Sequence, residues 1–253
     1  VGLSVIVRRA DLMRNFGKLA LFAAVAGSAV VSIIVFGARL GLWEPIVGYG
    51  LYRSYLNPLG AVIAVLGALA VVVHARRKER AGMAAGAIAT VIGLACLTPL
   101  MVSTLSPPQR AAPIHDISTD TVNPPAFEVI DESRAGARNT LIYGGADVAA
   151  MQARAYPDIA PLETELSPDA AHVRALEVAE DMGWEIVAAD AERRRFEATA
   201  RTSVFYFADD VVVVVTPQGG GSRVDMRSVS RVGGSDQGVN AARIRTFQEH
   251  FSQ

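Results

Sequence analysis

The densest concentration of polar side chains that could do chemistry lies between residues 225 and 243. It combines arginines, serines, an aspartate and an asparagine around a Gly-Gly pair. A Gly-Gly turn that leads into a helix presents free backbone N–H groups, and arginine forks suit phosphate or carboxylate. The pattern therefore suggests an anion-binding site made by Arg227, Ser228, Ser230, Arg231, Asp236, Asn240 and Arg243.

The same residues also fit a purely structural arrangement. Asp236 follows the Gly-Gly turn and precedes an apolar stripe at helical spacing, so its carboxylate is placed to cap a helix. Arg227 and Arg231 can pair with the nearby acidic residues Asp209, Asp210 and Asp225. Because ion-pair networks often imitate binding sites, we favour the structural interpretation and predict that Asp236 is mainly a helix cap.

A second polar group, His115 and Asp116 with Asp120, offers nitrogen and oxygen ligands. It is a weak metal motif, because metal sites usually need three or more well-placed protein ligands. Cys96 is the only cysteine, which excludes an internal disulfide and a cysteine-based zinc site. We therefore expect no metal and no cofactor.

Hydrolytic chemistry would need Ser228 or Ser230 as the nucleophile and His115 as the base. No G-x-S-x-G elbow is present, and both serines are expected on a polar strand rather than on a strained turn. Their neighbours in the sequence assign His172 and His250 to solvated helix faces. The residues therefore define no catalytic constellation.

The chain that positions these groups has two halves of opposite charge. Residues 1–109 carry 10 basic and 3 acidic side chains, a net charge of +7, and residues 110–253 carry 14 and 22, a net charge of −8. Such asymmetry indicates two environments. An acidic domain binds nucleic acid poorly, so we expect no nucleic-acid partner.

Three charge-free apolar stretches in the first half predict three transmembrane helices, at 19–38, about 56–74 and 81–105. Each approaches the roughly 20 residues that a bilayer core requires. The first continues past a cleavage-like motif at 24–26, which favours an uncleaved helix over a signal peptide. The absence of Asp, Glu, Lys and Arg from the spans disfavours a transporter. We expect His74 at the membrane interface.

Basic residues flank the predicted spans unevenly, and this predicts the orientation. Four precede the first span and four lie between the second and third, whereas the first connection has two and the region after the third span has Arg110. By the positive-inside rule, the N-terminus is cytoplasmic and residues 110–253 are periplasmic or otherwise extracytoplasmic. The basic residues before the first span are Arg8, Arg9, Arg14 and Lys18.

Residues 110–253 predict a soluble α+β domain whose first part, 110–166, is irregular. Within that part we expect a short strand at 127–130 and a helix at 146–155. A helix then begins at Ser167, which is followed by proline and aspartate. Its predicted apolar stripe consists of Ala170, Val173, Leu176, Ala179 and Met182.

Four strands and a final helix complete the predicted domain. The strands are expected at 184–189, 196–200, 211–215 and 222–230, and the helix follows Asp236. This order indicates an antiparallel sheet of about four strands with helices on one face, attached to a membrane anchor of three helices.

Three separated motifs carry a family resemblance. They are the run from Ile114 to Asp120 (IHDISTD), the run from Phe207 to Val211 (FADDV), and the long run from Val224 to Ile244. Together they resemble the family called domain of unknown function 1499, over roughly residues 112–250. The apolar first half resembles the membrane anchor of bacterial members. The resemblance implies no catalytic residues, because the family has no assigned function.

Two functions remain open. The preferred one is a non-catalytic membrane protein, in contact with membrane lipids, whose outer domain binds an envelope protein, a lipid headgroup or a cell-wall component. The alternative is a membrane-surface enzyme, such as a hydrolase, that uses the polar cluster at 225–243, with His115, Asp116, Asp209 and Asp210 as further polar candidates. Small residues at close-packing spacing, such as Gly60 and Ala64, also allow a homo-oligomer.

Overall fold

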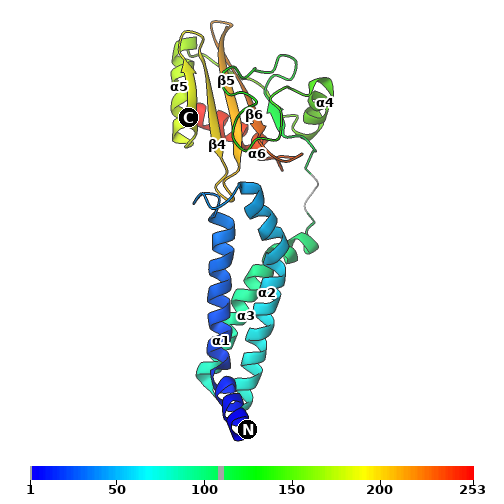
Figure 1. Cartoon of the computed structure of the whole chain (residues 1–253). Coiled ribbons are helices and arrows are strands. Elements are labelled where there is room, and N and C mark those ends of the chain that lie inside the picture. Colours follow the sequence, from blue (N-terminus) through cyan, green and yellow to red (C-terminus); the bar gives the residue numbers. More distant parts are fainter. Residues whose placement is uncertain (1, 108–110) are drawn as a thin grey trace. The chain divides into compact units, whose positions relative to one another are not determined.

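The computed structural model describes residues 2–107 and 111–253, with side chains from Met13 onward (Figure 1). The chain forms two compact units, residues 1–109 and residues 110–253. Three basic residues that contribute to the orientation prediction, Arg8, Arg9 and Arg110, lie outside the described side chains.

The first unit consists of α1 (Gly2–Phe36), α2 (Pro45–Arg76) and α3 (Arg80–Leu105). Each contains a stretch that is long and apolar enough to cross a membrane, so these candidate spans suggest a multi-pass membrane protein. The second helix begins at Pro45, well before the predicted span, because proline fits the first turn of a helix. Tyr49, Tyr52 and Tyr55 therefore belong to α2.

Glycines let α2 and α3 approach closely. A Cβ atom on Gly67 would lie 2.7 Å from the Gly86 carbonyl oxygen, and a Cβ on Gly86 would lie 2.8 Å from that of Gly67. Likewise, a Cβ atom on Gly60 would lie 3.0 Å from the Gly93 carbonyl oxygen. The small residues thus serve packing within the chain, a role that small residues also have in helical membrane proteins. The homo-oligomer stays a prediction.

His74, near the end of α2, is buried within the first unit, and its location at the membrane interface stays a prediction. Its side chain is 1% exposed. The Gly17 N–H donates to Nε2 at 3.0 Å, and Nδ1 lies 2.6 Å from a carboxylate oxygen of Glu79. A buried imidazole with a partner at both nitrogens avoids the cost of unsatisfied polar groups. Sequence reasoning missed these partners because they come from α1 and from the α2–α3 connection.

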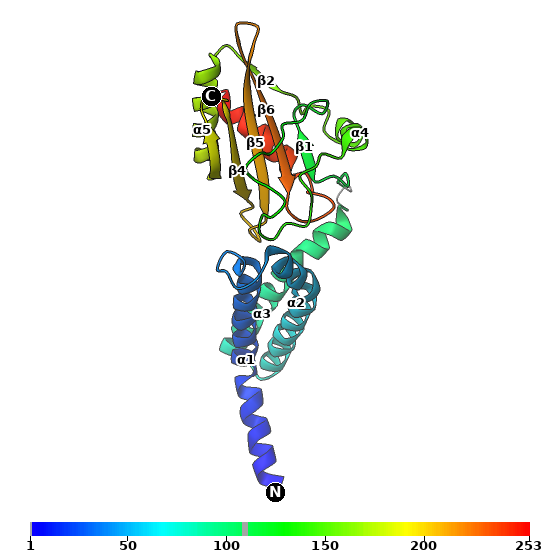
Figure 2. The same ribbon diagram turned by 45° about the horizontal axis from the view of Figure 1, so that its top comes forward.

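The second unit is built on one antiparallel sheet of six strands (Figure 2). The strand order is β1-β6-β5-β4-β3, and β2 also pairs with β6. The prediction of about four strands missed β1 and β2, because three residues are too few to show an alternating pattern. The strands are β1 (Asp116–Ser118), β2 (Leu162–Thr164), β3 (Glu185–Asp190), β4 (Arg195–Arg201), β5 (Ala208–Gln218) and β6 (Gly221–Ser230).

Three helices accompany the sheet: α4 (Gly145–Ala155), α5 (Pro168–Asp181) and α6 (Val239–Phe251). The Ser167 hydroxyl accepts a hydrogen bond from the Ala170 N–H, as expected for a helix cap. Gln152 of α4 completes the free edge of β1: its side-chain amide donates to the Ser118 carbonyl at 2.6 Å and accepts from the Ser118 N–H at 3.0 Å. This pairing protects an exposed strand edge.

The inner face of α5 matches the predicted stripe in part, because Ala179 is buried in the core and Leu176 and Met182 pack against it. Ala171, Ala175 and Val178 are buried, whereas Val173 is 54% exposed. The small alanines allow a close approach to the sheet, and this favours their face over the one with the larger Val173. His172 is buried at 3% exposure beside the Phe196 ring, so the solvated assignment was wrong. His250 is exposed, as predicted.

The hydrophobic core lies between the sheet and the helices α5 and α6. Phe196, Val213 and Met226 form one row across β4, β5 and β6 and belong to this core. The Phe247 ring of α6 stacks on Trp184 with centroids 5.5 Å apart. Both helices thus cover one face of the sheet, and Figure 2 shows α6 behind the strands.

An irregular stretch, residues 119–144, lies over the opposite face and is called the covering segment here (Figure 2). The strand predicted at 127–130 is absent, because these residues are irregular. The N–H groups of residues 128–130 bond to the Glu197 side chain of the sheet instead of to a neighbouring strand.

Candidate functional site

The predicted polar site is divided between the two faces of the sheet. Successive side chains of a strand point to opposite faces. Ser228 and Ser230 of β6 therefore face α6, whereas Arg227 faces the covering segment and Arg231, just after the strand, points to that side as well. Residues that are adjacent in sequence thus belong to two separate clusters.

The cluster on the helix face is buried and internally paired. The Ser228 hydroxyl donates to the Asn240 side-chain oxygen at 2.8 Å and accepts from Arg243 at 2.9 Å. Arg243 also pairs with Asp209 at 2.5 Å, and the Asn240 amide reaches Ser230 at 3.0 Å. All five side chains are less than a tenth exposed. Their hydrogen-bonding groups hold α6 against the sheet.

Asp236 satisfies backbone N–H groups at the start of α6. One carboxylate oxygen accepts from Gly238 at 3.1 Å and the other accepts from Asn240 at 2.7 Å. The residue at the formal cap position is Gly238, which has a φ of 83° that favours glycine. Asp236 thus stabilises the helix start from two residues upstream. Burial raises the pKa of its carboxyl group despite these two hydrogen bonds.

On the face of the sheet opposite α6, Arg227 holds the covering segment against the strands. It makes a two-point ion pair with Asp116 of β1, at 2.9 and 2.7 Å. It also donates to the carbonyls of Pro125 and Leu141. The guanidinium lies 5.5 Å from the Phe127 ring centre and 5.3 Å from that of Tyr143, within cation–π range. Burial raises the Tyr143 pKa to about 12.

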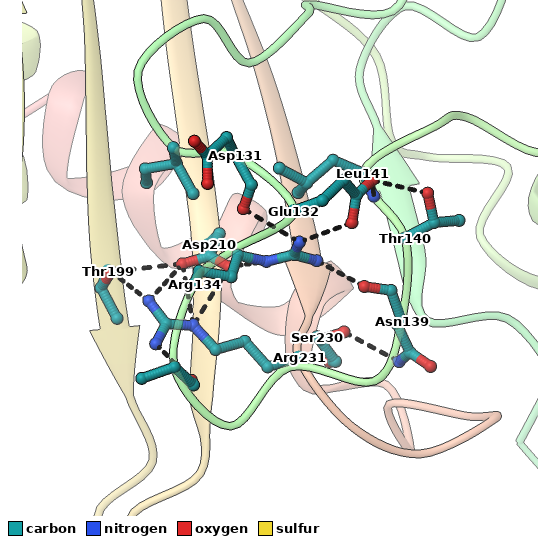
Figure 3. Close-up of polar contacts among 12 residues, drawn as sticks. Asp131, Glu132, Arg134, Asn139, Thr140, Leu141, Thr199, Asp210, Ser230 and Arg231 are labelled. Atoms are coloured by element: carbon teal, nitrogen blue, oxygen red, sulfur yellow. Dashed lines mark hydrogen bonds and ion pairs between the residues drawn. The ribbon is translucent and has the colours of Figure 1, made fainter.

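Asp210 forms a second attachment point, drawn in Figure 3. Its carboxylate is fully buried and accepts from Arg134 at 2.7 Å and from Arg231 at 2.8 Å. Arg134 belongs to the covering segment and also donates to the Asn139 carbonyl at 2.6 Å. Two arginines on one carboxylate supply the pairing that a buried charge requires.

Glu197 of β4 forms a third attachment point. Its carboxylate is 1% exposed and accepts from the consecutive N–H groups of Glu128, Val129 and Ile130, at 2.6, 3.1 and 2.7 Å. Arg195 completes the arrangement at 2.9 Å. Consecutive N–H groups of this kind make a concave anion-binding nest, here filled by the protein's own side chain.

Sequence reasoning missed Glu197 and Arg134 as partners of the sheet. The sequence offered one signal. Glu197 is an acidic residue between two apolar residues of a predicted strand, and the irregular part of the domain requires hydrogen-bond partners outside itself. Arg231 does pair with Asp210, as the structural alternative proposed, whereas Arg227 pairs with Asp116 instead of with any of the three aspartates named for it.

In the part of the chain that the structure describes, neither Ser228 nor Ser230 is hydrogen-bonded to the His115 imidazole. Ser228 contacts Asn240 and Arg243, and His115 contributes its backbone carbonyl, which accepts from Ser230 and Asn240. Among the described residues, no three His, Cys, Asp or Glu side chains gather as metal ligands. Asp120, which was considered for metal binding, pairs with Arg223 at 2.6 Å and accepts from turn N–H groups that lower its pKa.

One sizeable cavity of the second unit lies away from these clusters. It has a volume of about 570 Å³ and opens at the β5–β6 turn. Its walls are residues 163–165 and 218–222, none of which belongs to the polar clusters. A smaller cavity of about 60 Å³ lies beside Glu197 and Arg195. That volume suits a few water molecules and not a metabolite.

Taken together, these features define a protein class: three candidate membrane helices joined to an α+β domain that buries several ion pairs. The family model for the protein of unknown function DUF1499 matches residues 116–251, more than half of the 253-residue chain. The chain therefore belongs to the DUF1499 family, as its three motifs indicated. Among curated proteins, none matches the chain.

Proposed function

We propose that this chain is a non-catalytic protein of the cell envelope whose extracytoplasmic domain binds a partner protein through the covering segment. One observation carries the proposal: the covering segment is fixed by buried charged side chains beneath it, and it exposes large apolar side chains on its outer surface. Asp116, Glu197, Asp210 and Arg227 are buried in ion pairs and hydrogen bonds that fix its path.

The outer surface of the same segment is apolar at three points. Val122 is 84% exposed, Ile142 is 77% exposed and Val129 is 57% exposed. A long irregular segment that is held in one shape while large apolar side chains face outward is typical of binding loops on a rigid scaffold. Preorganisation lowers the entropic cost of binding, which favours a partner of protein size.

The burial of the polar clusters supports binding over catalysis. A substrate could reach Ser228, Asn240 or Arg243 only if α6 left the sheet, because each is less than a tenth exposed. The extracytoplasmic location of the domain rests on the basic flanks of the helices, so it forms part of the proposal.

Site-specific photo-crosslinking in intact cells tests the proposal. A photoreactive residue at Ile142 or Val122 should yield the same discrete protein adduct. The same residue at Val173, an exposed apolar position on α5 at 54%, is the matched control and should not yield it. Equal adduct patterns at all three positions, or no adduct at positions 142 and 122, would count against a binding surface on the covering segment.

A further inference from the structure

We infer that a groove between α1 and α2 is a binding site for one acyl chain of a membrane phospholipid. The groove has a volume of about 420 Å³, within the range of roughly 300–1,000 Å³ that ligand pockets usually have. None of the described residues that line it is charged. Val30 and Ile34 line it from α1, and Tyr55, Leu56 and Val62 line it from α2.

The groove has a buried floor and exposed walls. Ile34 and Leu56 are buried, whereas Val30, Tyr55 and Val62 are exposed. Because exposed side chains flank the buried ones, the groove is open along one side of the helix pair. A ligand that lies in it can therefore stay continuous with the surrounding medium, as the rest of a phospholipid must.

Close contacts between α1 and α2 toward both ends of the groove fix its width. A Cβ atom on Gly27 would lie 2.6 Å from Cδ1 of Ile63, and a Cβ on Gly48 would lie 2.8 Å from the Ile34 carbonyl oxygen. Glycine at both points lets the two helices touch, and the longer side chains between these points leave the groove. A preformed cavity of this kind lowers the entropic cost of binding.

The groove lies within two of the candidate membrane spans, Met13–Phe36 and Pro45–Arg76. In a bilayer, an apolar surface at this position meets either acyl chains or other apolar helices. An empty groove would leave its lining atoms without contacts on one side, and the dispersion energy lost in this way favours occupancy. Two occupants are thus available, a lipid chain and a further helix.

The side chains of the groove favour the lipid chain. Helices that pack in membranes approach each other through small residues. This chain uses Gly60, Gly67, Gly86 and Gly93 in that way between α2 and α3. Among the described residues that line the groove there is no Gly, Ala, Ser or Thr, and most are branched aliphatic or aromatic. A flexible hydrocarbon chain can follow walls of this shape, whereas a rigid helix requires a smoother surface.

The length and the polarity of the groove fit one leaflet of a bilayer. It extends along α2 from Tyr52 to Val62, which is about 15 Å at a rise of roughly 1.5 Å per residue. That length is half of the bilayer core, which is roughly 30 Å thick. Val62 is near the middle of α2, so Tyr55 and the exposed Arg53 lie toward one membrane surface. Tyrosine is favoured at that level, and arginine suits the phosphate of a phospholipid.

Photo-crosslinking of the full-length chain in phosphatidylcholine vesicles tests the inference. A small fraction of the phosphatidylcholine carries a diazirine in the middle of one acyl chain, and mass spectrometry locates the adducts on the protein. Ile33 is the matched reference position: it is on α1 at nearly the depth of Val30, it is 48% exposed against 49% for Val30, and it does not line the groove. Adducts at Val30 and Leu59 should exceed those at Ile33 several-fold.

Two tryptophan variants separate the effect of the groove from the effect of exposure. Val30→Trp places a large ring in the groove and should lower the adducts at Leu59 several-fold. Ile33→Trp is the matched control and should leave the adducts at Leu59 unchanged. The comparison of positions in the unsubstituted chain stands by itself, so the test does not depend on the folding of either variant.

Three outcomes would overturn the inference. Equal adducts at Val30 and Ile33 would show that the groove holds no chain in preference to the bulk lipid. Fewer adducts in the groove than at Ile33 would show that protein covers it. An equal effect of the two tryptophan variants on Leu59 would assign the adducts to exposure alone. All three leave partner binding by the covering segment untouched, because that segment belongs to the second unit.

Discussion

At the residue scale, Asp236 shows how burial and hydrogen bonding oppose each other at one carboxyl group. Burial raises its pKa, while the N–H groups of Gly238 and Asn240 lower it. The effect of burial is the larger of the two, so the net shift of the pKa is upward. The folded-state pKa therefore lies above the unfolded value near 3.8. A carboxyl group of this kind stabilises the fold most when protonated, and that contribution is lost as the pH rises from the unfolded pKa through the folded one.

Asp236→Asn should remove this pH dependence. The amide keeps one oxygen acceptor and carries no charge, so the variant should gain stability relative to the wild type as the pH rises through that interval. Asp236→Ala should cost about 0.5–2 kcal/mol because it leaves the helix N–H groups without the cap. Denaturant unfolding of residues 110–253 between about pH 3 and pH 7 measures both effects. A wild-type-to-Asn difference that is constant with pH would contradict the account.

At the scale of elements, the covering segment is held by side chains of the sheet and not by strand pairing. This explains why sequence reasoning found the regular elements and missed the segment's path. The five-valine stretch and the Ser167 cap carry local signals that read directly as a strand and a helix start. Arg134 pairs with Asp210, and Glu197 accepts hydrogen bonds from residues 128–130. Both contacts join residues that are some 70 positions apart in the sequence, and no local pattern encodes such distant pairings.

Arg227→Met should release the covering segment. It leaves the Asp116 carboxylate buried without its partner, and breaking a buried pair in this way costs about 3–5 kcal/mol. The matched control is Arg245→Met, which breaks the exposed pair with Asp158 and should cost about 0–1 kcal/mol. Denaturant unfolding gives the two losses, and limited proteolysis within residues 119–144 should accelerate for the Arg227 variant alone. Equal losses for the two variants would argue against a pinning role.

At the scale of the whole molecule, charge asymmetry and apolar runs indicated a helical anchor joined to an α+β domain, and both parts are present. Composition is informative at this scale because a bilayer demands about 20 apolar residues in each helix whatever the tertiary contacts. The division of residues 225–243 between two faces follows from strand alternation. That division became visible only once the register of β6 and its partners was known.

Orientation is the prediction at this scale that rests on flanking charge alone. A reporter that is active only outside the cytoplasm should be active when fused after Gln253 and silent when fused after Lys78. The physical reason is that the basic clusters at the N-terminus and between α2 and α3 resist translocation. Activity after Lys78 together with silence after Gln253 would invert the assignment.

Buried charges shape the covering segment, and we propose that this shape binds a partner. Arg134→Gln tests it most directly, because it detaches the segment from Asp210 while Arg231 still pairs with that carboxylate. With the photoreactive residue at Ile142, this variant should lose the specific adduct although the domain remains folded by circular dichroism. Arg138→Gln, an exposed arginine of the same segment, is the control and should retain it. A folded Arg134→Gln protein that gives the same adduct in the same yield would contradict the account.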